Sequence, residues 1–289
     1  MHKIAFFLFA CLLVFCGCSD EDNITESEAI KISGDTVFVT PGSTSIQAAV
    51  DTAETGAIIL VADGIYRGNG NRDISFGGKS VTVKSVNSPA LTIIDCEGDS
   101  ANPHQAFLLF QRENEAVIEG FTIRNGYAGN GGAINLRSVS PTIRNCIFQD
   151  NHAYSSGGAM RLKASSPDII NCTFVGNSSD MIGGAIFLLA GSSPHLQNCI
   201  IAFSDESEGI IPGEITSQPT FTCCNIYGNA GGDWVTEIAD QAGINGNMSV
   251  DPQFCDTAGY DYSLQNSSPC VAGNNDCGEL IGALEPECN

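Results

Sequence analysis

The chain repeats itself with a period of about 26 residues over its central half. Prolines follow one another at steps of 26, 27 and 25 residues, and the same short motifs return in phase behind them. A fixed period of this length is the sequence signature of a solenoid, because one short unit cannot bury its apolar face alone and must stack on its neighbours. The phase is marked by Pro141, Pro167, Pro194 and Pro219, by Asn-Cys pairs at 145–146, 171–172 and 198–199, and by GGA triplets that start at Gly131, Gly157 and Gly183.

Within each repeat, apolar residues alternate with polar ones over short runs. Ile134 and Leu136 flank Asn135, and residues 160–162 have the same pattern one repeat later. Alternation with period two, broken by Gly, Asn, Ser and Pro, predicts short strands joined by turns, and about three such strands fit into one period. We therefore expect an all-β fold, a parallel β-helix with three short strands per coil of about 26 residues, in which coils stack about 4.8 Å apart.

An Asn-Cys pair marks the same turn in successive coils. Cys behaves as a small hydrophobe inside a protein, so we expect one inward column of thiols. The Asn side chains carry donors and acceptors and predict a hydrogen-bonded ladder along that column. A second interpretation stays open, in which each Asn is present only because it tolerates a left-handed turn. The expected structural ladder consists of Asn145, Asn171 and Asn198 with Cys146, Cys172, Cys199 and Cys224.

Two motifs of the repeat carry a resemblance to known proteins. GGAI at 131–134 and 183–186, GGAM at 157–160, FQDN at 148–151 and FVGN at 174–177 resemble the repeats of polymorphic outer membrane proteins. More broadly, the chain resembles bacterial right-handed parallel β-helix proteins of the pectin-lyase-like superfamily. The resemblance implies a right-handed tube, and it implies an outer face on which many relatives cleave or epimerise acidic polysaccharides.

The segment before the repeat resembles the start of that fold, where a short helix covers the open end of the tube. In residues 45–68, Ile46, Ala49 and Val50 recur at helical spacing, and Gly56 is a plausible stop. We therefore expect a short N-terminal capping helix. The resemblance extends from about residue 35 to residue 281, which is nearly all of the chain after its N-terminal segment.

The N-terminus is typical of an export signal followed by an anchor. A short basic start precedes an apolar run at residues 4–15, which is too short to span a bilayer. Gly17 and Cys18 match a bacterial lipobox, in which the Cys is lipidated after cleavage, although Phe15 stands where that pattern prefers Leu. An ordinary signal peptide cut nearby is the alternative. The expected division is a signal peptide at 1–17, an acidic tether at 18–33, the β-helix at 34–250 and a Cys-containing C-terminal cap at 251–289.

The cysteines near the C-terminus lie outside the repeat. Cysteines in the loop-rich segments of exported proteins commonly form disulfide cross-links. We therefore expect disulfides among Cys255, Cys270, Cys277 and Cys288. Of the three possible pairings we favour Cys255–Cys288 with Cys270–Cys277. A zinc site is the rival interpretation, and the absence of a CxxC pair counts against it. The pattern assigns no role to two further cysteines, Cys96 and Cys223.

The net charge of −21 excludes one class of partner. A surface this acidic repels a phosphate backbone, so we expect no nucleic-acid binding. Against this background, Arg137, Arg161 and Lys163 fall on one predicted outer face, at positions between the inward residues of the strands after GGA. They are candidates for binding an anionic glycan. The alternative, which is the commoner case, is that long basic side chains simply cover a surface strand.

Signals for catalysis are weak. Asn102-Pro103-His104-Gln105 distantly resembles the Asp-Pro-His motif of β-helix alginate epimerases, with amides in place of the acids. Acidic residues at 95, 97 and 99 offer a weak Ca²⁺ alternative to the expectation of no cofactor, and no Ser-His-Asp arrangement can be placed.

The sequence therefore favours a non-catalytic, exported β-helix lipoprotein of the cell envelope, acting in adhesion or glycan binding. It is expected at the outer membrane or cell surface, monomeric, with a polysaccharide as partner and contact with the membrane only through the lipid. The alternative is a polysaccharide lyase or epimerase that acts on an acidic glycan.

Overall fold

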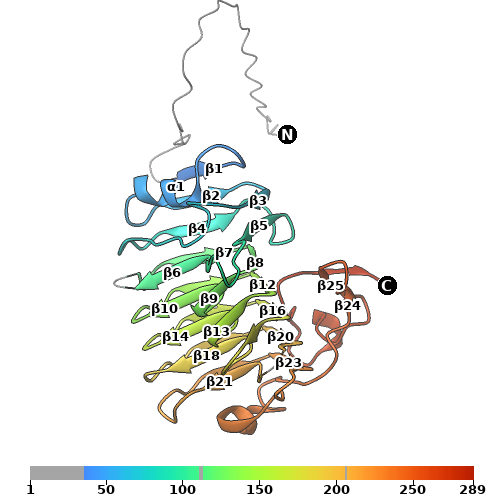
Figure 1. Ribbon diagram of the computed structural model, residues 1–289. Coiled ribbons are helices and arrows are strands. Elements are labelled where there is room, and N and C mark those ends of the chain that lie inside the picture. The colour runs from blue at the N-terminus through green and yellow to red at the C-terminus, as the bar shows by residue number, and fades with distance from the viewer. Residues whose placement is uncertain (1–35, 111–112, 206) are drawn as a thin grey trace, which may run out of the picture.

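The computed structural model describes residues 36–110, 113–205 and 207–289, and these form a parallel β-helix (Figure 1). Three long sheets run along the tube, as the repeat predicts, and every strand pair within them is parallel. Register partners lie one coil apart, so that Ile143 pairs with Ile169 and Ile134 pairs with Met160. The expected signal peptide and acidic tether, with Cys18, lie outside the described residues.

The strands of the three sheets succeed one another along the tube axis. Sheet 1 contains β1 (Thr36–Val39), β2 (Ile58–Val61), β4 (Thr82–Ser85), β7 (Val117–Glu119), β11 (Thr142–Arg144), β15 (Asp168–Ile170), β19 (His195–Gln197) and β22 (Thr220–Thr222). Sheet 2 contains β3 (Gly64–Tyr66), β5 (Thr92–Asp95), β8 (Thr122–Arg124), β12 (Ile147–Gln149), β16 (Thr173–Val175), β20 (Ile200–Ala202) and β23 (Asn225–Tyr227). Sheet 3 contains β6 (Phe107–Phe110), β10 (Ile134–Arg137), β14 (Met160–Lys163), β18 (Ile186–Leu189) and β21 (Ile210–Pro212).

A short fourth sheet lies at the corner between sheets 2 and 3. This corner sheet contains β9 (Tyr127–Asn130), β13 (His152–Ser156) and β17 (Ser178–Ser179). The central coils therefore have four strands, one more than the alternation of apolar residues indicates. The extra strand escapes sequence analysis because its residues are small or polar and give no apolar alternation.

The core is the inside of the tube. Apolar side chains of equivalent strands stack in columns, and Phe148 and Phe174 lie face to face with ring centroids 4.6 Å apart. The predicted thiol column is present as well. Its members are fully buried and unpaired, and they are Cys146, Cys172, Cys199 and Cys224. Burial raises the pKa of the Cys172 and Cys224 thiols, so they stay protonated and behave as small apolar groups.

The GGA motif is explained by the turn into sheet 3. The first glycine adopts a left-handed conformation in each coil, with φ of 64° at Gly131 and 68° at Gly157. The second glycine faces the next coil, and a Cβ at Gly158 would collide with the carbonyl oxygen of Gly184. One glycine is thus required by backbone conformation and its neighbour by the close approach of stacked coils.

The expected asparagine ladder is wrong in its position. Asn145, Asn171 and Asn198 all have positive φ, near 50°, and no side-chain hydrogen bond joins them within the described residues. They serve the left-handed turn, which is the second interpretation, and the Asn171 amide in addition donates to the Leu280 carbonyl of the C-terminal segment at 2.9 Å. The side-chain ladder is built instead by the Asn of the FxxN motifs, because Asn151 and Asn177 point into the tube and bond to each other.

The N-terminal end of the tube is covered by α1 (Ile46–Thr52). The Ser45 hydroxyl accepts from the Ala48 N–H and begins the helix, and Ile46, Ala49 and Val50 are buried against the first coil. The helix expected from the spacing of these apolar residues is confirmed.

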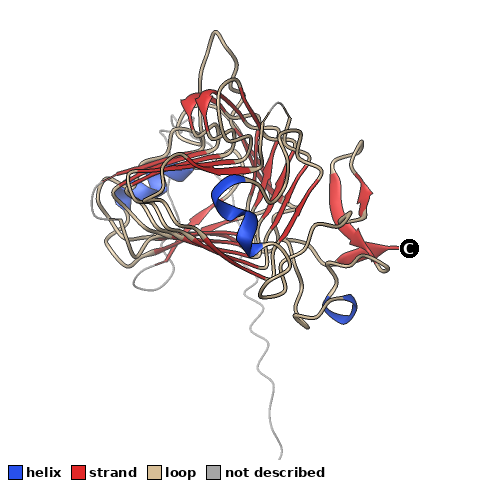
Figure 2. Ribbon diagram, turned by 90° about the horizontal axis from the view of Figure 1, so that it is seen from below, coloured by secondary structure: helices blue, strands red, loops and turns tan. Residues whose placement is uncertain are grey.

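Residues 229–250 cover the other end. The 3₁₀ helix η1 (Thr236–Gln241) crosses the end of the tube (Figure 2) and buries Ile238 completely in the core. Trp234 packs edge-on against Phe221 of the last coil at 5.2 Å between ring centroids. The last strand of the tube, β23, ends at Tyr227, and a parallel β-bridge between Asn225 and Met248 continues the stacking of the coils beyond it.

The segment 251–289 lies against the side of the tube and not over its end (Figure 1). It forms an antiparallel pair, β24 (Phe254–Asp256) with β25 (Asp261–Gln265), a third strand β26 (Pro286–Cys288) and a 3₁₀ turn η2 (Ala272–Asn274). Phe254, Leu264 and Ile281 bury the apolar outer residues of sheet 2, such as Ile147 and Ile200. These outward apolar residues explain why the C-terminal segment folds back along the tube.

Two disulfides hold this segment. Cys255 is bonded to Cys288, as expected, and Cys223 is bonded to Cys277. The expected Cys270–Cys277 pair is therefore wrong. Cys270 is a buried free thiol that accepts from the Asn225 amide, and burial raises its pKa to about 11. Sequence could not reveal that Cys223, which belongs to the repeat, faces outward toward the C-terminal segment.

No helix within the described residues has the length and apolarity needed to cross a membrane.

Candidate functional site

The three predicted basic residues lie together on the outer face of sheet 3. Arg161 is the register partner of Asn135, and Lys163 is the register partner of Arg137, so the four side chains form two adjacent columns. Neighbouring strands are about 4.8 Å apart, which brings the cationic groups within reach of one ligand.

Apolar side chains border this basic face on both sides. Phe110 and Leu108 precede the columns on β6, and Phe187 and Leu189 follow them on β18. Phe110 is 37% exposed, whereas Phe187 and Leu189 are half-buried. We call the whole surface the sheet 3 face, and its outward residues are Leu108, Phe110, Asn135, Arg137, Arg161, Lys163, Phe187 and Leu189.

The sheet 3 face has polar atoms without partners. Asn135 Oδ1 and Arg161 Nε are buried and have no hydrogen bond in the part of the chain that the structure describes. Burial, together with the neighbouring charge of Arg137, lowers the pKa of Arg161 from its usual value. A guanidinium that is partly desolvated and adjacent to a like charge gains most from an anion placed beside it.

The cations of the sheet 3 face have no acidic partner among the described residues. The ion pairs found there between arginine and carboxylate involve Arg67, Arg72, Arg124 and Arg144, all outside this face. In a protein with 33 acidic and 12 basic residues, three cations left uncompensated side by side are unusual.

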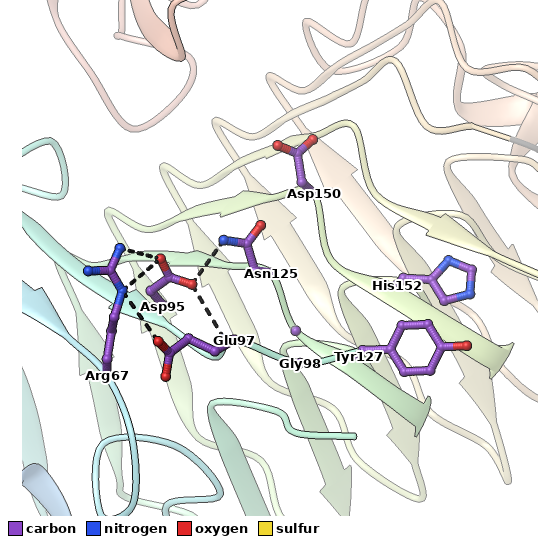
Figure 3. Close-up of a pocket in the computed structure, with 9 residues that line it drawn as sticks. Arg67, Asp95, Glu97, Gly98, Asn125, Tyr127, Asp150 and His152 are labelled. Atoms are coloured by element: carbon purple, nitrogen blue, oxygen red, sulfur yellow. Dashed lines mark hydrogen bonds and ion pairs between the residues drawn. The ribbon is translucent and has the colours of Figure 1, made fainter. Parts of the chain in front are cut away.

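A second region is a hollow of about 550 Å³ at the corner between sheet 2 and the corner sheet (Figure 3). Its wall comes from the ends of β5 and β8 and from the starts of β9 and β13. The residues that give it polar character are Arg67, Asp95, Glu97, Asn125, Asp150 and His152, with Tyr127 beside His152.

Asp95 is the centre of a charge network at one side of the hollow. Its carboxylate accepts from Arg67 at 3.0 Å, from Arg124 at 3.1 Å and from the Asn125 amide at 2.9 Å. Burial would raise the pKa of Asp95, but the hydrogen bonds from Asn125 and Arg67 and the charge of Arg124 hold it below its usual value. The Asp95 carboxylate is hydrogen-bonded by its protein neighbours, so this network forms a rigid wall of the hollow.

On the other side of the hollow, Tyr127 and His152 line the wall and belong to a cluster that extends into the next coil and that sequence analysis did not find. His152 stacks on Tyr127, with ring centroids 4.9 Å apart and the ring planes 19° from parallel. His152 Nδ1 lies 2.8 Å from Ser178 Oγ, and its Nε2 lies 3.1 Å from Asp180 Oδ1. No sequence signal unites these residues, because only the stacking of coils makes His152 and Ser178 register partners.

A family model described as a right handed beta helix region matches residues 79–249, which is more than half of the chain. The chain belongs to the right-handed β-helix family. A comparison with curated proteins gives no match.

In this right-handed β-helix, the epimerase-like motif is not assembled into a wider site. His104 Nδ1 lies 2.6 Å from Asp73 Oδ2 at the edge of the tube. Of the carboxylates considered for Ca²⁺, Asp95 and Glu97 both contact Arg67, whereas Asp99 accepts from the N–H groups of the turn that follows it. The described residues contain no cluster of three or more side chains suited to a metal ion.

The fold alone does not assign an activity to a β-helix protein, because one scaffold carries many functions. The two regions with unusual chemistry are the sheet 3 face and the hollow beside His152.

Proposed function

We propose that the protein is an exported, lipid-anchored β-helix of the cell envelope that binds an anionic polysaccharide on its sheet 3 face without cleaving it. The observation that carries this proposal is the set of three adjacent cations, Arg137, Arg161 and Lys163, that have no acidic partner among the described residues.

The chemistry of the face matches a sugar acid. A guanidinium donates two parallel hydrogen bonds to one carboxylate or sulfate, and such charge-assisted bonds are among the strong ones. Phe110 and Phe187 lie on either side of the cations and offer apolar surface to the C–H side of a sugar ring.

The face lacks the groups that cleavage requires. A glycosidase needs two carboxylates at a set separation, and the outward positions of β6, β10, β14 and β18 include no Asp or Glu. A lyase needs a base and, in this kind of chemistry, a cation held by acids to stabilise the developing anion. The absence of carboxylates from these strands favours binding over the lyase or epimerase alternative on this face.

The test is a glycan array probed with the purified protein, followed by affinity measurements on the polysaccharides it retains. Each charge-assisted hydrogen bond contributes about 1.5–3 kcal/mol, so Arg161→Ala with Lys163→Ala should weaken binding at least tenfold. Arg144→Ala is the matched control, because Arg144 is exposed on sheet 1 and already paired with Glu119. Equal affinities of the double variant and the wild type would reject the site.

Catalysis is tested on the same ligands. Incubation with uronate polymers should release no unsaturated product detectable by its ultraviolet absorbance. Release of such product, retained in the Arg161→Ala and Lys163→Ala variant, would favour a lyase acting elsewhere on the tube.

The anchor is tested separately. Support for it comes from Gly17-Cys18 after the apolar run at residues 4–15. Radiolabelled palmitate should enter the wild-type protein in a bacterial host and should not enter Cys18→Ala. Equal labelling of both proteins would refute lipidation at Cys18.

A further inference from the structure

The imidazole of His152 lies between a hydroxyl and a carboxylate. Ser178 Oγ is 2.8 Å from Nδ1, and Asp180 Oδ1 is 3.1 Å from Nε2. These are the three side-chain types, in the linear order hydroxyl, imidazole, carboxylate, that activate a serine for nucleophilic attack. Here Nδ1, rather than Nε2, faces the hydroxyl.

The carboxylate determines which nitrogen carries the proton. Nε2–H donates to Asp180, so the lone pair of Nδ1 is left to accept from the Ser178 hydroxyl. His152 is therefore held in the tautomer that a general base requires. The stacked ring of Tyr127 fixes the plane of the imidazole from the preceding coil.

Stacking of coils alone accounts for only part of this arrangement. His152 and Ser178 are register partners, and neighbours in a column of a parallel sheet lie close together in any β-helix. Asp180 is not in that column, yet its carboxylate lies against the second nitrogen of the ring. A comparable pair on sheet 1, His195 with Asp168 at 3.8 Å, has no serine hydroxyl bonded to the imidazole within the described residues.

We propose that Ser178 is the nucleophile of an esterase site that removes short acyl groups from hydroxyl groups of a ligand bound in the hollow beside His152. The Ser178 oxygen forms a bond to the acyl carbonyl carbon while His152 Nδ1 takes the hydroxyl proton. The bond from that carbon to the alkoxy oxygen breaks, and the alcohol leaves with the proton from His152. Water then attacks the acyl-serine with His152 again as base, which releases the carboxylic acid and restores Ser178.

The lining of the hollow defines the class of substrate. His152 forms part of the wall, together with Asn125 and Asp150, which can bond to hydroxyl groups. The wall is formed largely by charged and amide side chains, which suits a polyhydroxylated alcohol bearing a small acyl group such as acetyl. The hollow is on the corner sheet and the sheet 3 face is on another side of the coil, so this inference does not depend on glycan binding there.

The first test is covalent labelling of the purified full-length protein with a fluorophosphonate probe, read as intact mass. One adduct should form, and peptide mapping should place it on Ser178. Ser178→Ala and His152→Gln should both lose the adduct, whereas the matched control His195→Gln should keep it. Absence of any adduct on the wild-type protein, or an adduct that survives in Ser178→Ala, would overturn the proposal.

The second test is hydrolysis of p-nitrophenyl acetate and of an acetylated oligosaccharide. General-base catalysis contributes about 10²- to 10⁴-fold, so His152→Gln should lower the rate by about that factor. Ser178→Ala lacks the nucleophile and should lower the rate to that of buffer. Asp180 does not contact the substrate and acts as a positioning residue. Asp180→Asn should lower kcat with little change in KM, and Asp180→Glu should restore part of it. Urea unfolding of every variant distinguishes a loss of activity from a loss of the fold. Equal kcat values for Asp180→Asn and the wild type would show that Asp180 does not position His152 for catalysis.

Discussion

Asn151 donates a hydrogen bond from its side-chain amide to Oδ1 of Asn177 at 3.0 Å, and both side chains are completely buried. The same Asn177 oxygen accepts from the Asn151 main-chain N–H at 3.1 Å, and the Asn177 amide donates to the Phe148 carbonyl at 2.8 Å. The inner asparagines thus satisfy main-chain groups at a bend where the sheet ladder is interrupted.

We expect Asn177→Ala to destabilise the fold by about 3 kcal/mol, because it orphans a buried donor on Asn151 and a buried carbonyl on Phe148, each costing about 1–3 kcal/mol. Urea unfolding measures this loss. Asn145→Ala is the control, since Asn145 serves only a left-handed turn with φ of 53° and should cost about 1 kcal/mol. Similar losses from both substitutions would contradict the assignment of the ladder to Asn151 and Asn177.

Peptide mapping without reduction should recover two linked pairs, Cys223 with Cys277 and Cys255 with Cys288. Cys270 should resist alkylation until denaturant is added, because it is fully buried. A peptide that links Cys270 to Cys277 would disagree with the structure.

Loss of the Cys223–Cys277 bond should destabilise the C-terminal segment, residues 251–289, more than the tube. We expect Cys277→Ser to lower the free energy of unfolding by about 2–4 kcal/mol and to speed hydrogen exchange in residues 251–289. Cys270→Ala serves as the matched control, because it removes a thiol from the same segment without cutting a link. Unchanged exchange in Cys277→Ser would show that apolar packing alone holds the segment.

Asp95 should make stability depend on acid pH. Its pKa is lower in the folded protein than in the unfolded chain, so its contribution is fully present above about pH 4 and is lost as the pH falls toward the folded value. Asp95→Asn should cost about 3 kcal/mol at pH 7, because Arg67 and Arg124 lose their shared partner. Between pH 7 and pH 3, the free energy of unfolding should decrease less for Asp95→Asn than for the wild type. Parallel curves of free energy against pH for the two proteins would contradict this role of Asp95.

Glu113 should make stability depend on pH in the sense opposite to Asp95. It is fully buried, its Oε2 has no partner within the described residues, and burial raises its pKa. A raised folded pKa contributes stability below the unfolded value near 4.3, and that stability is lost as the pH rises through the folded pKa. Glu113→Gln keeps an acceptor for the Gly78 N–H and avoids a buried charge, so it should be about 1 kcal/mol more stable than wild type at pH 7. A variant that is less stable than wild type at pH 7 would reject this expectation.

The period and the alternation of residues were sufficient to predict the tube. Equivalent residues such as Ile143 and Ile169 stack in register because each coil repeats the spacing of the last, so phase in the sequence becomes position in a column. The same reasoning placed Arg161 and Lys163 on one outer face, since inward neighbours fix which residues point out.

The sequence alone was insufficient where position depends on contacts between distant segments. Asn145 and Asn151 occur in the same repeat, and only the conformation of each turn decides which of them points inward. Cys223 finds Cys277 because the C-terminal segment folds back onto the apolar outer side of sheet 2, a contact that no local pattern encodes.

By itself, then, the sequence determined the β-helix, its N-terminal helix, its thiol column and its basic outer face, because these follow from periodicity that acts over one coil. The tertiary structure alone decided the disulfide partners, the side position of residues 251–289 and the meeting of Ser178, His152 and Asp180. Those features depend on which side chains face each other after the coils have stacked and the chain has folded back, and that information is distributed over the whole molecule.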